Sequence, residues 1–240
     1  MYKVSADTCR GKVRSTNQDS FAWRILSDQL AYLIVCDGMG GESGGNVASY
    51  LAVNMVKAAL DRSLVEGIAS KSVRAALQSA VSAANAKILA EAQRDPRLKG
   101  MGTTLVAAVM VGSRAHFASV GDSRIYLGSR EGLKQLTHDH TVVQMLLENG
   151  EITPEEAKDH PKRHYITRAV GVAPQVEMDY DEAELEPGDS LLLCSDGLYN
   201  MLSEEELREL TAQKNLGRLM RQANENGGAD NITGVLLSLE

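Results

Sequence analysis

Apolar and polar positions alternate with a period of two over residues 2–8, which is typical of a strand with one buried face. A second strand is predicted at 21–23, where it pairs with the continuous apolar run at 31–36. Short apolar runs bounded by glycine and other turn residues predict further strands. These runs cover residues 102–111, 115–120, 125–127, 133–136, 176–185, 190–194 and 232–239. We expect those up to residue 136 to follow one another as a meander.

Two longer stretches, 43–62 and 70–93, carry apolar residues at helical spacing and are predicted to be amphipathic helices. The spaced positions are Val47, Leu51, Met55 and Ala58/Ala59 in the first, and Val73, Leu77, Ala80, Ala84 and Ile88 in the second. A capping box at 203–206 opens a third helix, and 216–225 forms a fourth. This order of elements favours an α+β fold of packed sheets with helices outside, rather than a parallel βαβ sheet.

The stretch 137–171 differs in character, because it is polar and predicts only short helices at 141–149 and 153–157. Four of the five histidines lie in it, namely His138, His140, His160 and His164. We interpret it as an excursion from the core. It is either a solvated surface segment or a basic segment that meets an anionic substrate.

Aspartates recur where predicted strands end or begin. Asp37 follows the buried run at 31–36 and precedes a loop with glycines at 38, 40 and 41, and Asp122, Asp196 and Asp230 have similar surroundings. Carboxylates at strand ends beside small residues are typical of ligands for a hard cation gathered at one sheet edge. The alternative is four unrelated turns, because Asp and Gly are both common in turns.

Length and composition limit the classes of protein to which this chain can belong. A chain of 240 residues that is 43% hydrophobic, without linker or repeat, is expected to form one domain over 1–240. The net charge of -7 disfavours a nucleic-acid binder. No signal peptide and no apolar run of about 20 residues is present, so we expect a cytoplasmic protein without a membrane span. Three cysteines in unpaired spacing indicate neither a disulfide frame nor a zinc site.

Six short motifs, in order and across nearly the whole chain, resemble those of the metal-dependent protein serine/threonine phosphatases of type 2C, in their short bacterial form. They are Arg14-x-x-Asn17-Gln-Asp19, Asp37-Gly-Met-Gly-Gly41, Gly102-Thr-Thr104, Val120-Gly-Asp122-Ser-Arg124, Cys194-Ser-Asp196-Gly197 and Asp230-Asn231. The resemblance implies a four-layer α-β-β-α sandwich of two antiparallel sheets flanked by helix pairs. It also implies a flap at about 137–171 beside the active site.

The same resemblance implies a centre of two Mn²⁺ or Mg²⁺ ions. Asp37 would bridge both ions, Asp196 and Asp230 would complete the first, and the Gly38 carbonyl would help to hold the second. Asp122, with Asp196, matches a third metal position seen in bacterial relatives. Two further residues would serve the reaction itself: Asp19 would orient metal-bound water, and Arg14 would grip the substrate phosphate.

The implied reaction is direct hydrolysis of phosphoserine or phosphothreonine in proteins, by attack of a metal-bridging water or hydroxide. Such a signalling phosphatase opposes a serine/threonine kinase, and we expect it to be a monomer. Two positions depart from eukaryotic relatives, which carry His where this chain has Met39 and Glu where it has Gln18. Met39 leaves no general acid at its position, and either metal-bound water or a flap histidine, His160 or His164, would supply the leaving-group proton.

Two other functions compete with this interpretation. One is a two-metal hydrolase of another phosphate ester, such as a nuclease or a small-molecule phosphatase; the acidic composition argues against a nuclease. The other is a catalytically silent domain that binds a kinase or a phosphoprotein. Retention of Asp19, Asp37, Asp196 and Asp230 argues against silence, because converging carboxylates are costly to bury.

Overall fold

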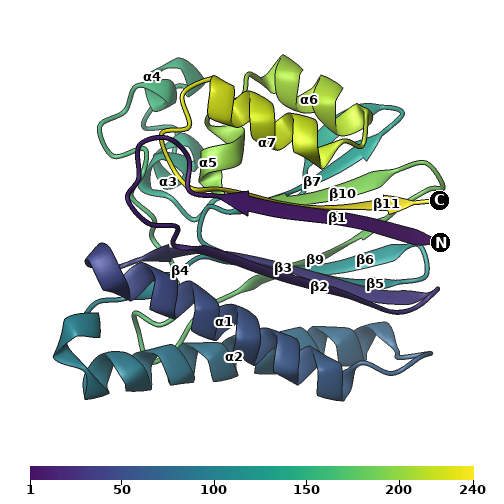
Figure 1. The fold of residues 1–240 in the computed structure, drawn as a ribbon, viewed down its shortest axis with the longest axis horizontal. Helices are drawn as coiled ribbons and strands as arrows, with labels where there is room; N and C mark the ends of the chain where they lie inside the picture. The colour runs from purple at the N-terminus through teal and green to yellow at the C-terminus, as the bar shows by residue number, and fades with distance from the viewer.

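The two β-sheets of the computed structural model lie face to face, and helices cover the outer face of each (Figure 1). The structure describes the backbone of residues 1–240 and every side chain except those of Glu42 and Ser43. Three apolar clusters fill the spaces between the layers, one between the sheets and one under each group of helices. The predicted α+β sandwich with helices on both sides is therefore confirmed.

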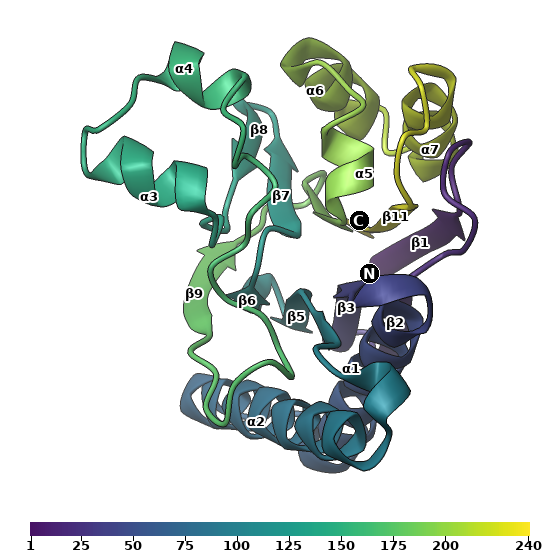
Figure 2. The ribbon, with the colours of Figure 1, turned by 90° about the vertical axis from the view of Figure 1, so that its left-hand side faces the viewer.

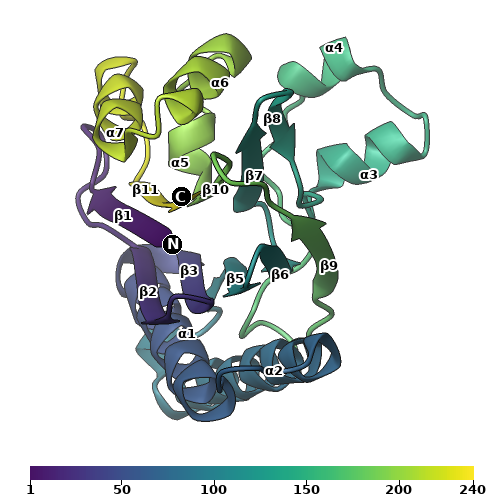
Figure 3. The same ribbon diagram turned by 90° about the vertical axis from the view of Figure 1, so that its right-hand side faces the viewer.

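The first sheet contains both ends of the chain. Its strands, in spatial order, are β1 (Tyr2–Cys9), β11 (Ile232–Leu239), β10 (Ser190–Cys194), β7 (Arg124–Ser129) and β8 (Gly132–Gln135), and all pairs are antiparallel. Because β1 pairs with β11, the amino group of Met1 donates to the Glu240 carbonyl at 2.7 Å. Figure 3 shows the two termini together at the end of the molecule that faces away from the site.

The second sheet is built around β3 (Leu30–Met39), which is apolar along most of its length. The order is β2 (Asp19–Ser27), β3, β5 (Leu105–Val111), β6 (Arg114–Val120) and β9 (Asp179–Glu184), and β4 (Gly102–Thr103) pairs with the end of β3. Both faces of β3 are buried: Leu33 and Val35 pack between the sheets, and Tyr32 and Ile34 pack toward the helices. Burial on both faces explains why the run lacks polar alternation.

Helices α1 (Gly41–Ser63) and α2 (Ser70–Arg94), followed by the short turn η1 (Pro96–Leu98), cover the second sheet. The predicted face of α2 is confirmed, but that of α1 is displaced by one residue. Its fully buried positions include Ala48, Ala52 and Val56, whereas Leu51 and Met55 are only partly buried. The small side chains of Ala48 and Ala52 let this part of α1 approach the sheet closely, and Leu51 and Met55 lie beside the buried face.

Helices α5 (Asp196–Tyr199), α6 (Glu204–Ala212) and α7 (Leu216–Glu225) cover the first sheet. The predicted capping box is present at the start of α6, where Ser203 and Glu206 satisfy each other's backbone N–H groups. The four-residue helix α5 was not predicted. Because α5 begins at Asp196, just after β10 ends, the helix fixes the direction of the Asp196 side chain.

Two expectations about the strands were wrong. Strands β6 and β7 do not continue one meander, because the chain crosses from the second sheet to the first over Gly121–Ser123. Gly121 makes this crossing with a φ of 99°, which favours glycine. The strand predicted at 176–185 begins only at Asp179, where pairing with β6 starts.

Residues 137–171, which we call the flap segment, lie outside both sheets. They contain α3 (Val142–Glu148) and α4 (Pro154–Lys158), and Figure 2 shows both helices to the side of β7 and β8. An isolated bridge between Thr141 and Ile166 closes the segment at its base. Its bounds, and the assignment of 1–240 to a single domain, stay predictions. Among the helices that the structure describes, none is long and apolar enough to cross a membrane.

Candidate active site

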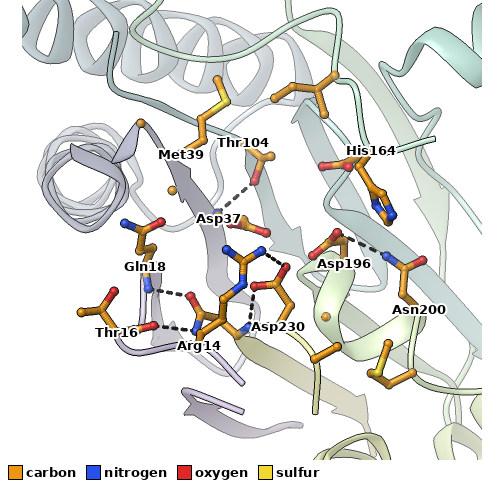
Figure 4. Close-up of a pocket in the computed structure, with 18 of the residues that line it drawn as sticks. Arg14, Thr16, Gln18, Asp37, Met39, Thr104, His164, Asp196, Asn200 and Asp230 are labelled. Atoms are coloured by element: carbon orange, nitrogen blue, oxygen red, sulfur yellow. Dashed lines mark hydrogen bonds and ion pairs between the residues drawn. The ribbon is translucent and has the colours of Figure 1, made fainter. Parts of the chain in front are cut away.

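A cavity of about 780 Å³ lies at one end of the sandwich, and Asp37, Asp122, Asp196 and Asp230 all line it. They come from the end of β3, the crossing between the sheets, the start of α5 and the residues just before β11. Figure 4 shows Asp37, Asp196 and Asp230 directed into the same space. The fold thus gathers at one edge four carboxylates that are spread over almost 200 residues, as the sequence predicted.

The β2–β3 hairpin positions Asp37. Its partner across the ladder is Asp19, and the N–H of Gly38 donates to the Gln18 carbonyl at 3.1 Å. On the other side, the N–H of Asp37 donates to Thr104 Oγ1 at 2.9 Å. Gly38 is required by close approach, because a Cβ there would lie 2.0 Å from the Gly45 carbonyl oxygen in α1.

Asp19 lies behind Asp37 and does not line the cavity. Its Oδ2 accepts a hydrogen bond from Ser195 Oγ at 2.7 Å, and Ser195 Oγ in turn accepts from the N–H of Thr233 at 3.1 Å. Within the part of the chain that the structure describes, Asp19 Oδ1 is buried and has no hydrogen-bond partner. Asp19 is therefore a buried carboxylate with one free acceptor atom, held by the first sheet.

Arg14 lies at the rim of the cavity and binds one of the four carboxylates. Its Nη2 donates to Asp230 Oδ2 at 2.6 Å, and its side chain remains 54% exposed. Asn231 fixes the loop that carries Arg14: its Oδ1 accepts from the Gln18 N–H, and its Nδ2 donates to the carbonyls of Arg10 and Thr16. A single amide thus holds the 10–18 loop against the end of the first sheet.

Mutual repulsion and burial govern the charge state of this cluster. Burial, followed by the charges of Asp19 and Asp196, raises the pKa of Asp37 well above its ordinary range. Burial and then the charge of Asp196 raise the pKa of Asp122 to about 7. Burial also raises the pKa of Asp19 to about 6, and it outweighs the opposite effect of the Thr233 and Ser195 hydroxyls. Without a compensating cation, burial and mutual repulsion therefore oppose the ionisation of Asp19, Asp37 and Asp122.

The residues present fit a hard divalent cation. Asp196 Oδ1, like Asp19 Oδ1, is buried without a partner among the described residues, and carboxylate oxygens are the ligands that Mn²⁺ and Mg²⁺ prefer. As the described side chains stand, no three acidic, His or Cys groups are arranged to hold one ion. Since Arg14 occupies an oxygen of Asp230, an ion at Asp230 would compete with Arg14 for the same carboxylate.

A sequence profile described as "Protein phosphatase 2C" matches residues 10–236, which include all the residues that line the cavity. The chain belongs to the protein phosphatase 2C family. The recognition made from the motifs is therefore confirmed, and with it the expectation of a phosphatase.

Three relatives of this phosphatase illustrate the similarity. The serine/threonine phosphatase Stp of Listeria innocua is 39% identical over 96% of this chain and 93% of its own. A solved serine/threonine phosphatase from S. agalactiae has a TM-score of 0.92 at 36% identity, with 100% of both chains covered. The catalytic domain of PstP, solved in complex with 2 manganese ions, has a TM-score of 0.85 at 38% identity, over 100% of this chain and 99% of its own.

Several positions of this phosphatase had no predicted role. Asn231 and Ser195 adjoin predicted ligands within two of the motifs, so their position in the sequence was the only signal. Tyr199, whose hydroxyl donates to the Asp122 carbonyl at 2.9 Å, gave no signal because α5 was not predicted. Gln18 lines the cavity, but its Nε2 donates to the Gly41 carbonyl at 2.8 Å, so its amide supports the glycine loop.

The two flap histidines that were considered as proton donors lie in different places. His164 lines the cavity (Figure 4), whereas His160 does not and accepts the Lys162 N–H at its Nδ1. Met39 also lines the cavity, and its thioether has no proton to donate. Only His164 thus remains as a nearby imidazole.

Proposed function

We propose that this chain hydrolyses phosphoserine and phosphothreonine esters in proteins, with divalent ions held by Asp37, Asp196 and Asp230. The observation that carries the proposal is the set of four carboxylates that line one cavity, with Arg14 at its rim. The relatives named serine/threonine phosphatases support the substrate class, and the manganese complex of PstP supports the metal. Mn²⁺ and Mg²⁺ are the proposed ions, two per chain with a third at Asp122.

The residues would divide the task as follows. Asp37 would bind both ions. Asp196 and Asp230 would also bind the first ion, and the Gly38 carbonyl would bind the second. When bound, the ions supply positive charge for the phosphoryl oxygens and lower the pKa of water enough for attack on phosphorus at neutral pH. Gly45 keeps the Gly38 carbonyl accessible, since a Cβ there would lie 2.7 Å from that oxygen.

Arg14 would bind the phosphate group of the substrate. Its guanidinium offers paired donors in the fixed geometry that phosphate oxygens match. In the structure Arg14 donates to Asp230 instead. With substrate and ions bound, Arg14 would contact the phosphate and Asp230 would contact an ion. Asp19, with Oδ1 free and buried behind Asp37, would accept a hydrogen bond from a water molecule and orient it.

The Met39 side chain has no proton to donate, so solvent water at the metal site would protonate the departing serine or threonine oxygen. His164 is the alternative donor, since it lines the cavity from the flap segment. The cellular role that follows from the substrate class is to oppose a serine/threonine kinase.

Phosphate release from a phosphothreonine peptide and from a chromogenic aryl phosphate tests the proposal. Chelator-treated protein is expected to be inactive on both, and excess Mn²⁺ should restore both activities. Asp196→Asn, prepared in parallel, should stay inactive and so exclude a contaminating phosphatase. Inactivity of the Mn²⁺-loaded protein on both substrates would support a silent binding domain, and activity on the aryl phosphate alone would indicate a small-molecule phosphatase.

A further inference from the structure

His140 is buried at the base of the flap segment, where the two ends of that segment pair with each other. Its carbonyl accepts the N–H of Thr167 at 2.7 Å, and the next residues pair through the Thr141–Ile166 bridge. On the other side, the N–H of His140 donates to the Gly121 carbonyl at 2.9 Å. The residue therefore connects the base of the flap to the crossing between the sheets.

The imidazole makes a second contact with the same crossing. The N–H of Gly121 donates to His140 Nδ1 at 3.1 Å, and Nε2 lies 3.0 Å from Asp179 Oδ2. Because a backbone N–H can only donate, Nδ1 must be the unprotonated nitrogen, and the neutral ring carries its proton on Nε2. Arg168 Nη1 lies 3.2 Å from Nε2 and donates to Asp179 Oδ1 at 2.8 Å, so Nε2 and Nη1 each have a separate oxygen of Asp179 as acceptor.

Gly121 directly precedes Asp122, and several contacts hold the backbone of residues 121–123 in place. A Cβ on Gly121 would lie 2.7 Å from the Thr104 Cγ2 atom, so the chain passes close to the loop that supports Asp37. Two more contacts hold the residues that follow: Tyr199 donates to the Asp122 carbonyl, and Ser123 Oγ lies 2.7 Å from Thr104 Oγ1. Of these contacts to residues 121–123, only the two made by His140 come from the flap segment.

We propose that His140 is a positioning residue, which couples the base of the flap segment to the Asp122 carboxylate through the Gly121 N–H. The ligand that Asp122 would bind is a divalent cation, and this inference rests on the proposed function of the site. A shift at the base of the flap would reach Asp122 through this hydrogen bond. Binding of substrate beside the flap and occupancy of the Asp122 position are then linked.

Two substitutions of His140 separate the hydrogen bonds of its two ring nitrogens. In His140→Asn, Oδ1 can replace Nδ1 as the acceptor for Gly121, whereas in His140→Gln the amide reaches the place of Nε2 and leaves Gly121 without its acceptor. The exposed neighbour His138, which contacts Glu148 and not the crossing, provides the control His138→Gln. Thermal melts of all variants show that each is folded.

The first measurement is amide hydrogen exchange at Gly121 in chelator-treated protein, which does not depend on activity. Loss of one buried hydrogen bond should speed exchange about tenfold in His140→Gln and much less in His140→Asn, with no change in His138→Gln. Long-range ¹H–¹⁵N spectra should place the ring proton on Nε2. Equal exchange in His140→Gln and wild type, or a proton on Nδ1, would overturn the proposal.

The second measurement is a double-mutant cycle on Mn²⁺-dependent turnover. His140→Gln should lower kcat with little change in KM, His140→Asn should lower it less, and neither should add to the effect of Asp122→Ala. If His140→Gln lowers kcat by the same factor in the Asp122→Ala background as in the wild type, His140 does not act through Asp122. If Asp122→Ala affects neither turnover nor ion binding, the coupling to an ion is wrong, although hydrolysis by the other carboxylates stands.

Discussion

Asp37 and Asp122 line the same cavity, but the chain holds them by different means. The backbone of Asp37 belongs to the end of a buried strand, so the second sheet fixes it, through pairing with Asp19 on one side and through Thr104 on the other. Asp122 lies in the short link between the sheets, and side chains from three other segments fix it: His140, Tyr199 and Thr104. One carboxylate thus depends on the fold itself and the other on contacts that include the flap segment.

This difference suggests separate tasks. A ligand built into the sheet keeps its position whether or not substrate is bound, which suits the ions required in every turnover. A ligand held partly from the flap segment suits a weaker ion whose occupancy varies with substrate. The predictions below test the two carboxylates and then the charges around them.

The largest effect is expected from Asp37→Asn. Removing one charge from the residue that would bridge both ions should abolish measurable turnover of a phosphothreonine peptide. The fold should survive, because Asn keeps the shape of the side chain and relieves repulsion in the cluster. Circular dichroism and a thermal melt check the fold, and turnover near that of wild type would show that the sheet-held carboxylate is dispensable.

Asp122→Ala should have a smaller effect. We expect turnover to fall roughly tenfold to a hundredfold, the range for supporting groups of metal sites, with two ions still bound tightly. Metal analysis after gel filtration measures the ions. Loss of both tight ions would mean that Asp122 belongs to the same set as Asp37 and that the contrast between them is wrong.

Arg14→Ala should act mainly on substrate binding. Loss of a charge-assisted contact to phosphate is expected to raise KM by roughly tenfold or more, while kcat changes little if the contact is equally strong in the transition state. Because Arg14 also occupies Asp230, Mn²⁺ should bind no more weakly to the variant. Steady-state kinetics at saturating Mn²⁺ measure both constants, and unchanged values would make Arg14 an ordinary surface charge.

Stability of the metal-free protein should decrease as pH rises. The pKa values of Asp19 and Asp122 increase on folding, from 3.8 to about 6 and about 7. Between these limits the folded state holds protons that the unfolded state releases, so their contribution to the free energy of unfolding falls as pH increases. Melting temperatures at pH 5 and 7.5 in chelator measure the slope. Asp122→Asn should flatten it, and an unchanged slope would contradict the assignment.

The smallest effect is expected from His164→Ala. If solvent protonates the leaving group, the variant keeps both limbs of the kcat–pH curve, with the His160→Ala variant as the control outside the cavity. Disappearance of one limb in His164→Ala alone, with metal content unchanged, would assign proton transfer to this imidazole.

Much of this arrangement could be predicted from the sequence, because hydrophobic period and turn residues depend on local chemistry. Strands β1 and β11, helices α2 and α7 and the convergence of the four aspartates follow from such patterns. The buried face of α1 could not be predicted in this way. Apolar periodicity selects large residues such as Leu51, whereas close packing on the sheet selects small ones such as Ala48 and Ala52.

The supports of the site were harder to predict than its carboxylates. Tyr199, Ser195 and His140 act through hydrogen bonds to residues between 19 and 176 positions away, which no local pattern encodes. The crossing at Gly121 was missed for the same reason, since the sequence gives the strand ends but not the sheet that each strand joins.

The most direct test of the account is the number of Mn²⁺ ions bound per chain at pH 7.5, measured by equilibrium dialysis and metal analysis. Wild-type protein is predicted to hold two ions tightly and a third weakly, and Asp37→Asn to hold neither tight ion. Equal binding by wild type and Asp37→Asn would contradict the claim that the buried carboxylates at this sheet edge form the metal centre.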